Sequence, residues 1–206
     1  MINVYLVRHG QTDYNKNGRF QGTTDVDLNE LGLRQANQIG KRLQSKRIDI
    51  IYASNLRRVA QTASVISMYT NSNIVTREEL REIDMGEWEC LNYEQVKAKY
   101  ASYHEEWSKH AEDMPYPGGE CGADVEKRAM KVIGEIINQG CEESVIVTSG
   151  GTIRVLLSSF MGLKLENRFL IDTDNCGLSV VRYDIQSRKY YIKCINDTSH
   201  LEEGES

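Results

Sequence analysis

Short apolar runs alternate along the chain with longer segments in which apolar residues recur every three or four positions. The short runs predict buried strands at 2–7, 49–53, 74–76, 145–147, 178–183 and 190–195. The longer segments predict helices at about 29–46, from 56 onwards, at about 121–138 and from 150 through 160. The alternation predicts the α/β fold class, as a three-layer αβα sandwich with a mostly parallel central sheet.

The first two predicted helices each have one apolar face. Asn29 can cap the first helix by accepting a hydrogen bond from a backbone N–H of its first turn. The buried positions of that helix are Ala36, Ile39, Gly40 and Leu43. The expected buried face of the second helix contains Leu56, Val59, Ala60 and Ala63.

Residues 90–117 interrupt the alternation and predict a helical insertion. Among many charges the segment carries the aromatic residues Tyr93, Tyr100, Tyr103, Trp107 and Tyr116. Pro115 and Pro117 near its end, followed by two glycines, are typical of a turn. A long insertion of this kind predicts a lid over a site, with its rings in contact with the substrate. The alternative is that the rings only pack the insertion onto the body of the protein.

The length of 206 residues predicts one domain over 1–201, followed by an acidic tail at 202–206 that is expected to be disordered. No apolar run approaches the roughly 20 residues of a membrane span. Met1 leads directly into the first strand, so neither a membrane partner nor a signal peptide is expected. The five cysteines are widely spaced and include no Cys-x-x-Cys, which argues against a disulfide framework or a zinc site and favours a cytoplasmic location.

The net charge of −5 is unevenly distributed. Residues 1–58 carry ten Lys and Arg against five Asp and Glu, whereas residues 78–126 carry four against fourteen. Because no basic stripe recurs along the chain, a nucleic-acid partner is not predicted. An anionic substrate must therefore be attracted locally, by a few arginines in a cleft. No feature of the sequence predicts an oligomeric state.

Chemically active residues follow the predicted strands directly. Arg8, His9 and Gly10 come at the end of the first strand, at the sheet edge where ligands bind in open α/β folds. Arg58 falls in the first turn of the second helix, where the backbone N–H groups already favour an anion. Its guanidinium adds a donor fork that matches phosphate oxygens. The sequence therefore predicts a phosphoryl-transfer site with His9 beside an anion clamp.

Further motifs occur in a fixed order along the chain: Phe20-Gln21-Gly22, Asp27 to Gly32, Ser54 to Thr62, Gly86 to Glu89, Pro117 to Glu120 and Asn196 to Leu201. Together with Arg8-His9-Gly10 they resemble the histidine phosphatase superfamily, the phosphoglycerate-mutase-like enzymes. The resemblance covers nearly the whole chain. Gly86 to Glu89, Pro117 to Glu120 and the Ser199-His200-Leu201 ending look like the phosphatase branch, which includes α-ribazole and broad-specificity phosphatases.

The resemblance implies catalytic roles for four residues. His9 matches the nucleophile that becomes phosphorylated on a ring nitrogen, and Arg8 and Arg58 match the arginines that bind the phosphoryl oxygens. Glu82 matches the general acid that protonates the leaving oxygen. His9 must be neutral to attack, and the adjacent arginines disfavour its protonated form. Two arginines can neutralise the phosphoryl charge without a metal, so neither a metal nor another cofactor is expected.

The resemblance also implies substrate-binding roles around the phosphate. Asn15 and Gln21 match residues that line the phosphate pocket, with Gly22 beside them in the same loop. Gly150 matches a residue that offers its backbone N–H to the phosphate.

Ser149 departs from the family pattern, which has a histidine directly before the two glycines. That histidine donates a hydrogen bond to the transferred phosphoryl group. A serine can also donate, but it is shorter and carries no positive charge, and losing one such donor typically costs about 10²–10³ in rate. Ser149 is then an engineered change, a natural feature of a slow or compensated enzyme, or a sign that the chain only binds phosphate.

The expected function is a phosphomonoester hydrolase that acts on a small phosphorylated metabolite through a phosphohistidine, weakened by Ser149. One alternative is a phosphoglycerate mutase, which moves a phosphoryl group between hydroxyls. A second alternative is a non-catalytic relative that binds a phosphorylated ligand. The identity of the phosphomonoester does not follow from the sequence.

Overall fold

The computed structural model describes residues 1–201, so the acidic tail expected at 202–206 lies outside the described residues. A single sheet of six strands has the order β3-β2-β4-β1-β5-β6. The strands are β1 (Ile2–Arg8), β2 (Ile50–Ala53), β3 (Asn73–Thr76), β4 (Glu143–Thr148), β5 (Leu178–Asp184) and β6 (Lys189–Asp197). Strands β1 to β4 pair in parallel, and β5 and β6 extend the sheet in antiparallel pairing. The prediction of a mostly parallel sheet is confirmed.

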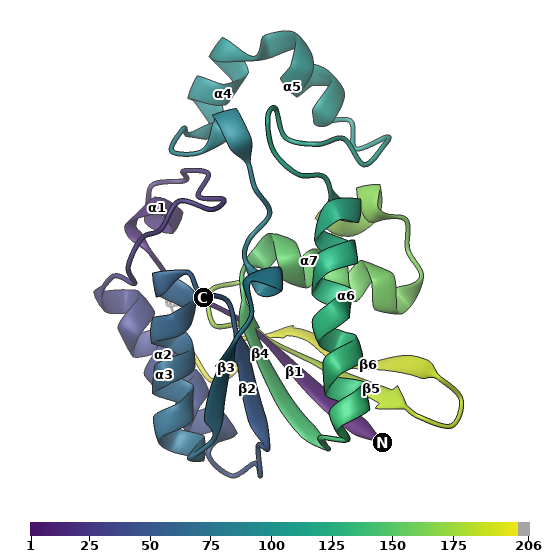
Figure 1. Ribbon diagram of the computed structural model, residues 1–206. Coiled ribbons are helices and arrows are strands. Elements are labelled where there is room, and N and C mark those ends of the chain that lie inside the picture. The colour runs from purple at the N-terminus through teal and green to yellow at the C-terminus, as the bar shows by residue number, and fades with distance from the viewer. Residues whose placement is uncertain (202–206) are drawn as a thin grey trace.

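Helices cover both faces of this sheet, as Figure 1 shows. They are α1 (Asp13–Lys16), α2 (Glu30–Leu43), α3 (Arg57–Thr70), α4 (Tyr93–Lys99), α5 (Ala101–Trp107), α6 (Gly122–Gln139) and α7 (Gly150–Met161). Helices α2 and α3 pack on one face, and α6 and α7 pack on the other. The result is the predicted αβα sandwich.

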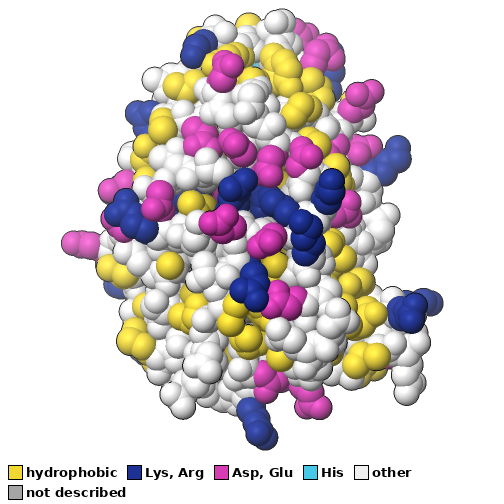
Figure 2. Space-filling view, in the orientation of Figure 1, with side chains coloured by type: hydrophobic (Ala, Val, Ile, Leu, Met, Phe, Trp, Pro, Cys, Tyr) yellow, Lys and Arg dark blue, Asp and Glu magenta, His cyan; other side chains and the backbone are white. Residues whose placement is uncertain are grey.

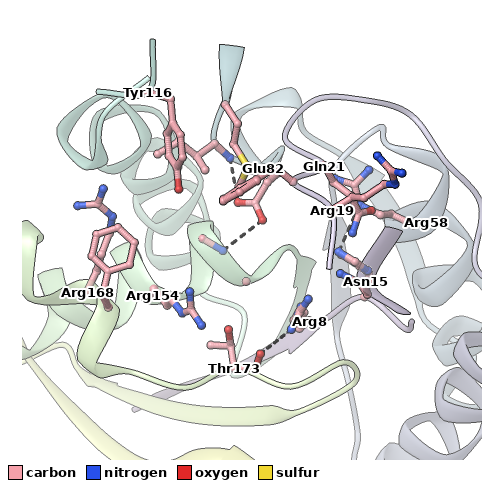
Figure 3. A pocket seen from close by; sticks show the side chains of 17 residues that line it. Arg8, Asn15, Arg19, Gln21, Arg58, Glu82, Tyr116, Arg154, Arg168 and Thr173 are labelled. Atoms are coloured by element: carbon pink, nitrogen blue, oxygen red, sulfur yellow. Dashed lines mark hydrogen bonds between the residues drawn. The ribbon is translucent and has the colours of Figure 1, made fainter. Parts of the chain in front are cut away.

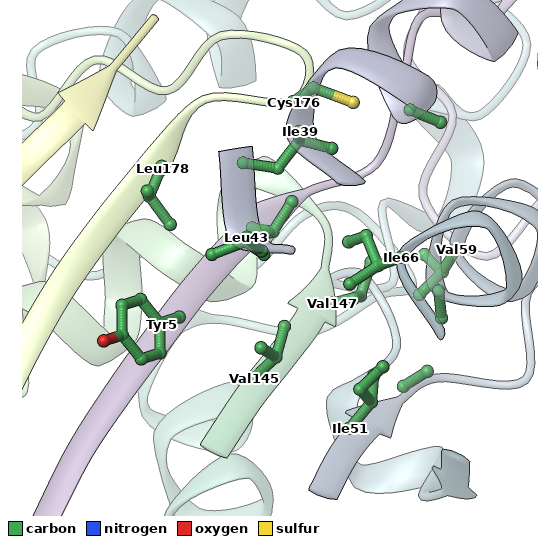
Figure 4. Packing of buried hydrophobic residues seen from close by; sticks show 14 of the residues in the cluster. Tyr5, Ile39, Leu43, Ile51, Val59, Ile66, Val145, Val147, Cys176 and Leu178 are labelled. Carbon is green, nitrogen blue, oxygen red and sulfur yellow. The ribbon is translucent and has the colours of Figure 1, made fainter. Parts of the chain in front are cut away.

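The central strands are apolar throughout because both of their faces are buried. On β1, Tyr5 and Val7 face α2 and α3, whereas Val4 and Leu6 belong to the cluster with α6 and α7. Figure 4 shows the first of these clusters, in which side chains of three parallel strands meet those of the two helices. Successive side chains of a strand point to opposite faces of the sheet, so each central strand contributes to both hydrophobic cores.

Helix α3 corrects one expectation. Ala60 is exposed, and Arg58 takes a buried position instead. The expected buried face was chosen from the apolar residues, because charged residues are rarely fully buried. Here each of the three guanidinium nitrogens of Arg58 donates one hydrogen bond inside the protein, which offsets much of the cost of burial.

The insertion predicted at 90–117 contains α4 and α5, and it stands beyond the carboxyl ends of the parallel strands (Figure 1). Its rings gather around Trp88, which is fully buried. The rings within 6.5 Å of Trp88 include those of Tyr100, Tyr103, Trp107 and Tyr116. These contacts favour the packing alternative for most of the aromatic residues.

The shortest helical elements were not predicted from the sequence. Helix α1 and the 3₁₀ turns at Glu78–Leu80, Gly86–Trp88 and Leu165–Leu170 span three to six residues each. A segment of that length has no helical period to detect. Within residues 1–201, no helix combines the length and the apolar character that crossing a bilayer requires. Figure 2 shows acidic side chains interspersed with Lys and Arg over the face drawn, in keeping with the mixed charges of the sequence.

Candidate active site

A cavity of about 180 Å³ opens where β1, β2 and β4 end. Its lining residues come from six separate parts of the chain. Figure 3 shows them together around the cavity. Seven of the nine residues expected in the site line this cavity: Arg8, His9, Asn15, Gln21, Arg58, Glu82 and Gly150. The remaining lining residues are Arg19, Phe20, Ile83, Met85, Tyr116, Gly151, Arg154, Arg168, Phe169 and Thr173.

His9 is held as a neutral ring whose one ring lone pair is on Nε2. Its Nδ1 lies 2.8 Å from the carbonyl oxygen of Gly10, which can only accept a hydrogen bond. The proton must therefore reside on Nδ1, and Nε2 carries the lone pair. The Nε–H of Arg58 donates to this Nε2 over 3.2 Å. The ring is only 2% exposed, and its backbone N–H is bonded to Thr148 of the neighbouring strand, so its position is fixed.

The surroundings of His9 disfavour its protonated form. Burial lowers the pKa of His9 well below the usual 6.5, and the charges of Arg58 and Arg8 lower it further. The hydrogen bond to Gly10 opposes these effects but does not outweigh them. His9 is therefore neutral at neutral pH, as a nucleophilic imidazole must be.

Arg58 is the most completely buried cation of the site. Its two Nη groups donate to the carbonyl oxygens of Thr24 and Gly22, each over 2.8 Å. Arg58 lies on the first turn of α3, which confirms its predicted place in the helix. Burial lowers the pKa of Arg58, and the charge of Glu82 opposes that shift.

Arg8 lies at the end of β1 with one nitrogen unsatisfied. Its Nη1 donates to the carbonyl oxygen of Thr173 over 2.6 Å, whereas its buried Nε has no hydrogen-bond partner within the described chain. Burial lowers the pKa of Arg8 to about 10, which still leaves it charged at neutral pH. A buried donor without a partner is costly, and an anion in the cavity would satisfy it.

Asn15 and Gln21 turn amide groups toward the cavity. The Oδ1 of Asn15 accepts from the backbone and hydroxyl of Thr12 and from Asn175. Three donors on the oxygen orient the amide, so that its Nδ2 is left for the cavity. Thr12 achieves this through the capping box of α1. Gln21 is buried, and its Oε1 has no partner in the described residues.

The carboxylate of Glu82 is fixed by two backbone donors. Oε1 accepts from the N–H of Ile83 over 2.9 Å, and Oε2 accepts from the N–H of Gly151 over 3.2 Å. Gly151 permits this approach because a Cβ there would lie 2.5 Å from Oε1. The carboxylate of Glu82 is therefore held against the first turn of α7, where it lines the cavity.

Two of the expected site residues do not line the cavity within the described chain. Gly22 supports the site indirectly, since its carbonyl oxygen holds Arg58 and its φ of +54° is a conformation that favours glycine. Ser149 is fully buried directly before α7, and its hydroxyl has no hydrogen-bond partner among the described residues.

Several lining residues were missed by the sequence analysis, above all Arg154, Arg168, Tyr116 and Thr173. Arg154 had a detectable signal, because it follows Gly150 by four residues and so shares its face of α7. Arg168 comes from the 3₁₀ turn Leu165–Leu170, which has no sequence period. Tyr116 is the one residue of the 90–117 insertion that lines the cavity in the described structure.

The fold and the cavity define a class of α/β protein with an arginine-lined cavity at the ends of its parallel strands. Comparison with known families makes the class specific. The sequence profile described as histidine phosphatase superfamily (branch 1) matches residues 4–198. The chain belongs to the histidine phosphatase superfamily.

Individual relatives resemble the chain over its whole length. Phosphoserine phosphatase 1 of Hydrogenobacter thermophilus is 30% identical over 204 residues, covering 98% of this chain and 96% of the relative. "Probable phosphoglycerate mutase GpmB" of Proteus mirabilis is 30% identical over 205 residues, covering 98% and 95%. The structure of a mycobacterial glucosyl-3-phosphoglycerate phosphatase, solved with VO3, superposes with a TM-score of 0.87 at 27% identity, covering 96% of this chain and all of that one.

Proposed function

We propose that this chain is a phosphomonoesterase that hydrolyses a small phosphorylated metabolite through a phosphohistidine on Nε2 of His9. The observation that carries the proposal is the state of His9, a buried neutral imidazole whose Nε2 lone pair faces Arg58 and lies under the positive charge of Arg58 and Arg8. The relatives named as phosphatases support the choice of reaction.

Binding places the phosphoryl group among donors that match its oxygens. Arg8 offers the unsatisfied Nε, and Arg58 offers the N–H groups not used by Gly22 and Thr24. The Nδ2 of Asn15 and the start of α7 at Gly150 complete the set. Charge neutralisation and positioning of this kind supply most of the catalysis in phosphoryl transfer.

In the first half-reaction, the lone pair on Nε2 of His9 attacks phosphorus as the bond from phosphorus to the ester oxygen breaks. Glu82, in its protonated form, gives its proton to that leaving oxygen, and the free alcohol departs. The phosphorylated imidazole keeps its proton on Nδ1, which continues to donate to the carbonyl oxygen of Gly10.

In the second half-reaction, water replaces the alcohol. The Glu82 carboxylate takes a proton from the water as the water oxygen attacks phosphorus. The bond between phosphorus and Nε2 breaks, which releases inorganic phosphate and restores the neutral His9. Glu82 is again protonated, so the cycle closes.

Ser149 sets the expected rate of this cycle. A histidine before Gly150 would bring a further donor to the phosphoryl group, and the buried hydroxyl of Ser149 has no partner in the described chain. We expect the Ser149→His variant to raise kcat by about 10²–10³. An unchanged kcat would show that this position does not limit the rate.

A phosphoenzyme assay tests the central step. The chain is incubated with a ³²P-labelled phosphomonoester, quenched, and tested for label that is stable in alkali and lost in acid. The His9→Ala variant should lose the label while keeping its fold by circular dichroism. The matched control is His200→Ala, since His200 lies outside the cavity lining and its ring is within hydrogen-bond distance of the carbonyl oxygen of Cys176. Label that persists in His9→Ala would exclude His9 as the nucleophile.

The same assay addresses the two alternatives. The mutase relative of Proteus mirabilis supports the first, in which turnover requires a bisphosphorylated primer and yields an isomer instead of free phosphate. The second, a phosphate-binding protein without catalysis, would give neither label nor free phosphate, even in the Ser149→His variant.

A further inference from the structure

The loop at 174–177, which leads into β5, lies against the end of β1 that carries the nucleophile. The backbone N–H of Cys176 is within hydrogen-bond distance of the carbonyl oxygens of Arg8 and His9, at 3.1 and 3.3 Å. The N–H of Arg8 donates to the carbonyl oxygen of Gly177 over 3.3 Å, so the pairing of β1 with β5 continues into the loop. The loop therefore holds the site from the side of the backbone.

Contacts from β6 fix the shape of this loop. Asn196 accepts from the backbone N–H of Asp174 and donates to its carboxylate, each over 2.7 Å. Gly177 leaves room for this side chain, since a Cβ there would clash with the Oδ1 of Asn196. Cys176 has a φ of +56°, a conformation that residues other than glycine adopt only rarely. A loop held in this way gives the residue at position 175 a defined place.

Asn175 joins two parts of the site with one amide group. Its Nδ2 donates to the carbonyl oxygen of His9 over 2.9 Å and to the Oδ1 of Asn15 over 3.2 Å. Both partners are acceptors, because a carbonyl oxygen only accepts and the Oδ1 of Asn15 already receives the N–H of Thr12. An amide nitrogen carries two protons, so one Nδ2 can make both bonds at once. Asn175 thus connects the nucleophile to an amide that lines the cavity.

Asn15 needs a second anchor because its own helix is short. Helix α1 spans four residues, and the other two donors to the Oδ1 of Asn15 both belong to Thr12, the N-cap of that helix. Asn175 is the donor from a distant segment, 160 residues further along the chain. Without it, the described hydrogen bonds to this oxygen would tie the amide to α1 alone, and the amide could shift with that turn relative to His9.

We propose that Asn175 is a positioning residue for phosphoryl transfer, which keeps the Nδ2 of Asn15 and the Nε2 of His9 in register around the phosphoryl group. The proposal rests on the proposed phosphatase function and adds to it a residue that acts through others, since Asn175 lies outside the described lining of the cavity. In such a role, a displacement of about 1 Å is enough to lower the rate by about 100-fold.

Two variants of Asn175 test the role with p-nitrophenyl phosphate as substrate. Asn175→Ala removes both hydrogen bonds, whereas Asn175→Asp keeps the shape of the side chain but sets acceptors against two acceptors. We expect each variant to lower kcat/KM by about 10- to 100-fold, with a lower kcat and a weaker inhibition by inorganic phosphate. Unchanged kinetics in both variants would overturn the proposal.

The matched control is Asn37→Ala. The exposed side chain of Asn37 on α2 also makes two hydrogen bonds, to the carbonyl oxygen of Leu33 and to the hydroxyl of Tyr69. Its loss should change kcat/KM by less than about 2-fold, because substitutions on the surface away from special features have small effects.

A double-mutant cycle shows whether Asn175 acts through Asn15. We expect Asn175→Ala to raise the Kd for inorganic phosphate by about 10-fold in the unaltered chain and by less than about 3-fold in Asn15→Ala. Losses that multiply in the double variant would overturn the coupling. A merely structural role would lower the melting temperature and the fraction of active protein, and so kcat, but would leave KM and this Kd unchanged. That outcome would also overturn the proposal.

Calorimetric titration with inorganic phosphate separates this proposal from the proposed function, because it measures Kd without turnover. Coupling between the two asparagines would support the link at the anion site even if the chain hydrolysed no phosphomonoester. Full activity with an unchanged Kd in Asn175→Ala would refute the link and leave the phosphatase function standing. If Asn175→Ala does not fold by circular dichroism, Asn175→Ser takes its place in the cycle, since the shorter hydroxyl cannot reach both acceptors.

Discussion

At the scale of single residues, the site depends on burying charged and titratable groups that are normally exposed. Arg58 and His9 are both buried, and each satisfies the other through one hydrogen bond. Burial lowers the pKa of His9 and so keeps the ring neutral. The hydrogen bond from Nδ1 to Gly10 leaves Nε2 as the ring nitrogen with the lone pair. The same burial makes the stability of the protein depend on pH.

His9 should destabilise the folded chain in mild acid. Its pKa is lowered well below 6.5 by burial and by Arg58 and Arg8, so the unfolded chain takes up a proton near pH 6.5 that the folded chain does not bind. Stability is therefore lost as the pH falls below 6.5, by about 1.4 kcal/mol at one pH unit below that value. Urea unfolding of the unaltered chain and of His9→Gln at about pH 7 and pH 5.5 measures this. An equal loss in both proteins would exclude His9 as its source.

Arg58 and its neighbour Arg57 provide a second test at this scale. Arg58 faces the cavity from a buried position, whereas Arg57 is exposed and pairs with Asp25 and Asp27. Arg58→Ala should weaken competitive inhibition by inorganic phosphate by about 10- to 100-fold, the effect of losing a charge-assisted contact. Arg57→Ala should change it by less than about 2-fold, because exposed ion pairs contribute little. Similar effects in the two variants would show that α3 presents the wrong arginine to the phosphate.

At the scale of elements, Arg128 on α6 holds the segment that carries Glu82. Its guanidinium donates to the carbonyl oxygens of Glu79, Arg81 and Glu82, and it pairs with Glu120 over 2.9 Å. The charge and hydrogen bonds of Arg128 lower the pKa of Glu120, so the pair stays ionised although partly buried. Arg128 therefore holds in place the segment of Glu82, the proposed general acid.

Replacing Arg128 should affect substrates according to their leaving groups. Arg128→Met should lower kcat by about 10- to 100-fold for an alkyl phosphate, whose alkoxide needs the proton from Glu82. For p-nitrophenyl phosphate, whose leaving group is stable without a proton, the loss should be less than about 3-fold. Arg128→Lys should recover part of the alkyl activity. An equal loss on both substrates would indicate general damage to the fold and not a misplaced acid.

The sequence predicted the elements that have a period and missed those without one. Val4, Leu6 and their neighbours identify β1, and Ala36 and Leu43 identify α2, because burial on a fixed face repeats along the chain. Arg168 could not be placed from the sequence, since it lies on a 3₁₀ turn whose position depends on its ion pair with Asp113. Asp113 is 55 residues away in the chain.

At the scale of the whole molecule, the cavity exists only because the topology brings distant segments to one edge of the sheet. Arg8 and Gly150 meet because β1 and β4 are parallel neighbours. The sequence predicted that such strand ends carry the site, and the family resemblance assigned the individual roles. The strand order and the antiparallel pairing of β5 and β6 depend on contacts across the whole chain, so no local pattern could predict them.

The arginines that line the cavity predict that anion binding stabilises the whole molecule. With five arginines and one carboxylate in the lining, we expect the folded chain to bind phosphate where the unfolded chain offers no such site. A ligand at about 100 times its Kd adds about 2.7 kcal/mol, which corresponds to a rise of about 5–10 °C in Tm for a chain of this size. Thermal unfolding in phosphate, compared with chloride at equal ionic strength, measures the effect.

The phosphate effect should fall by about half or more in Arg58→Ala and persist in Arg57→Ala, because Arg58 lines the cavity whereas Arg57 is exposed. A Tm that responds to chloride as strongly as to phosphate would mean that screening of the arginines, and not binding of a ligand, stabilises the fold.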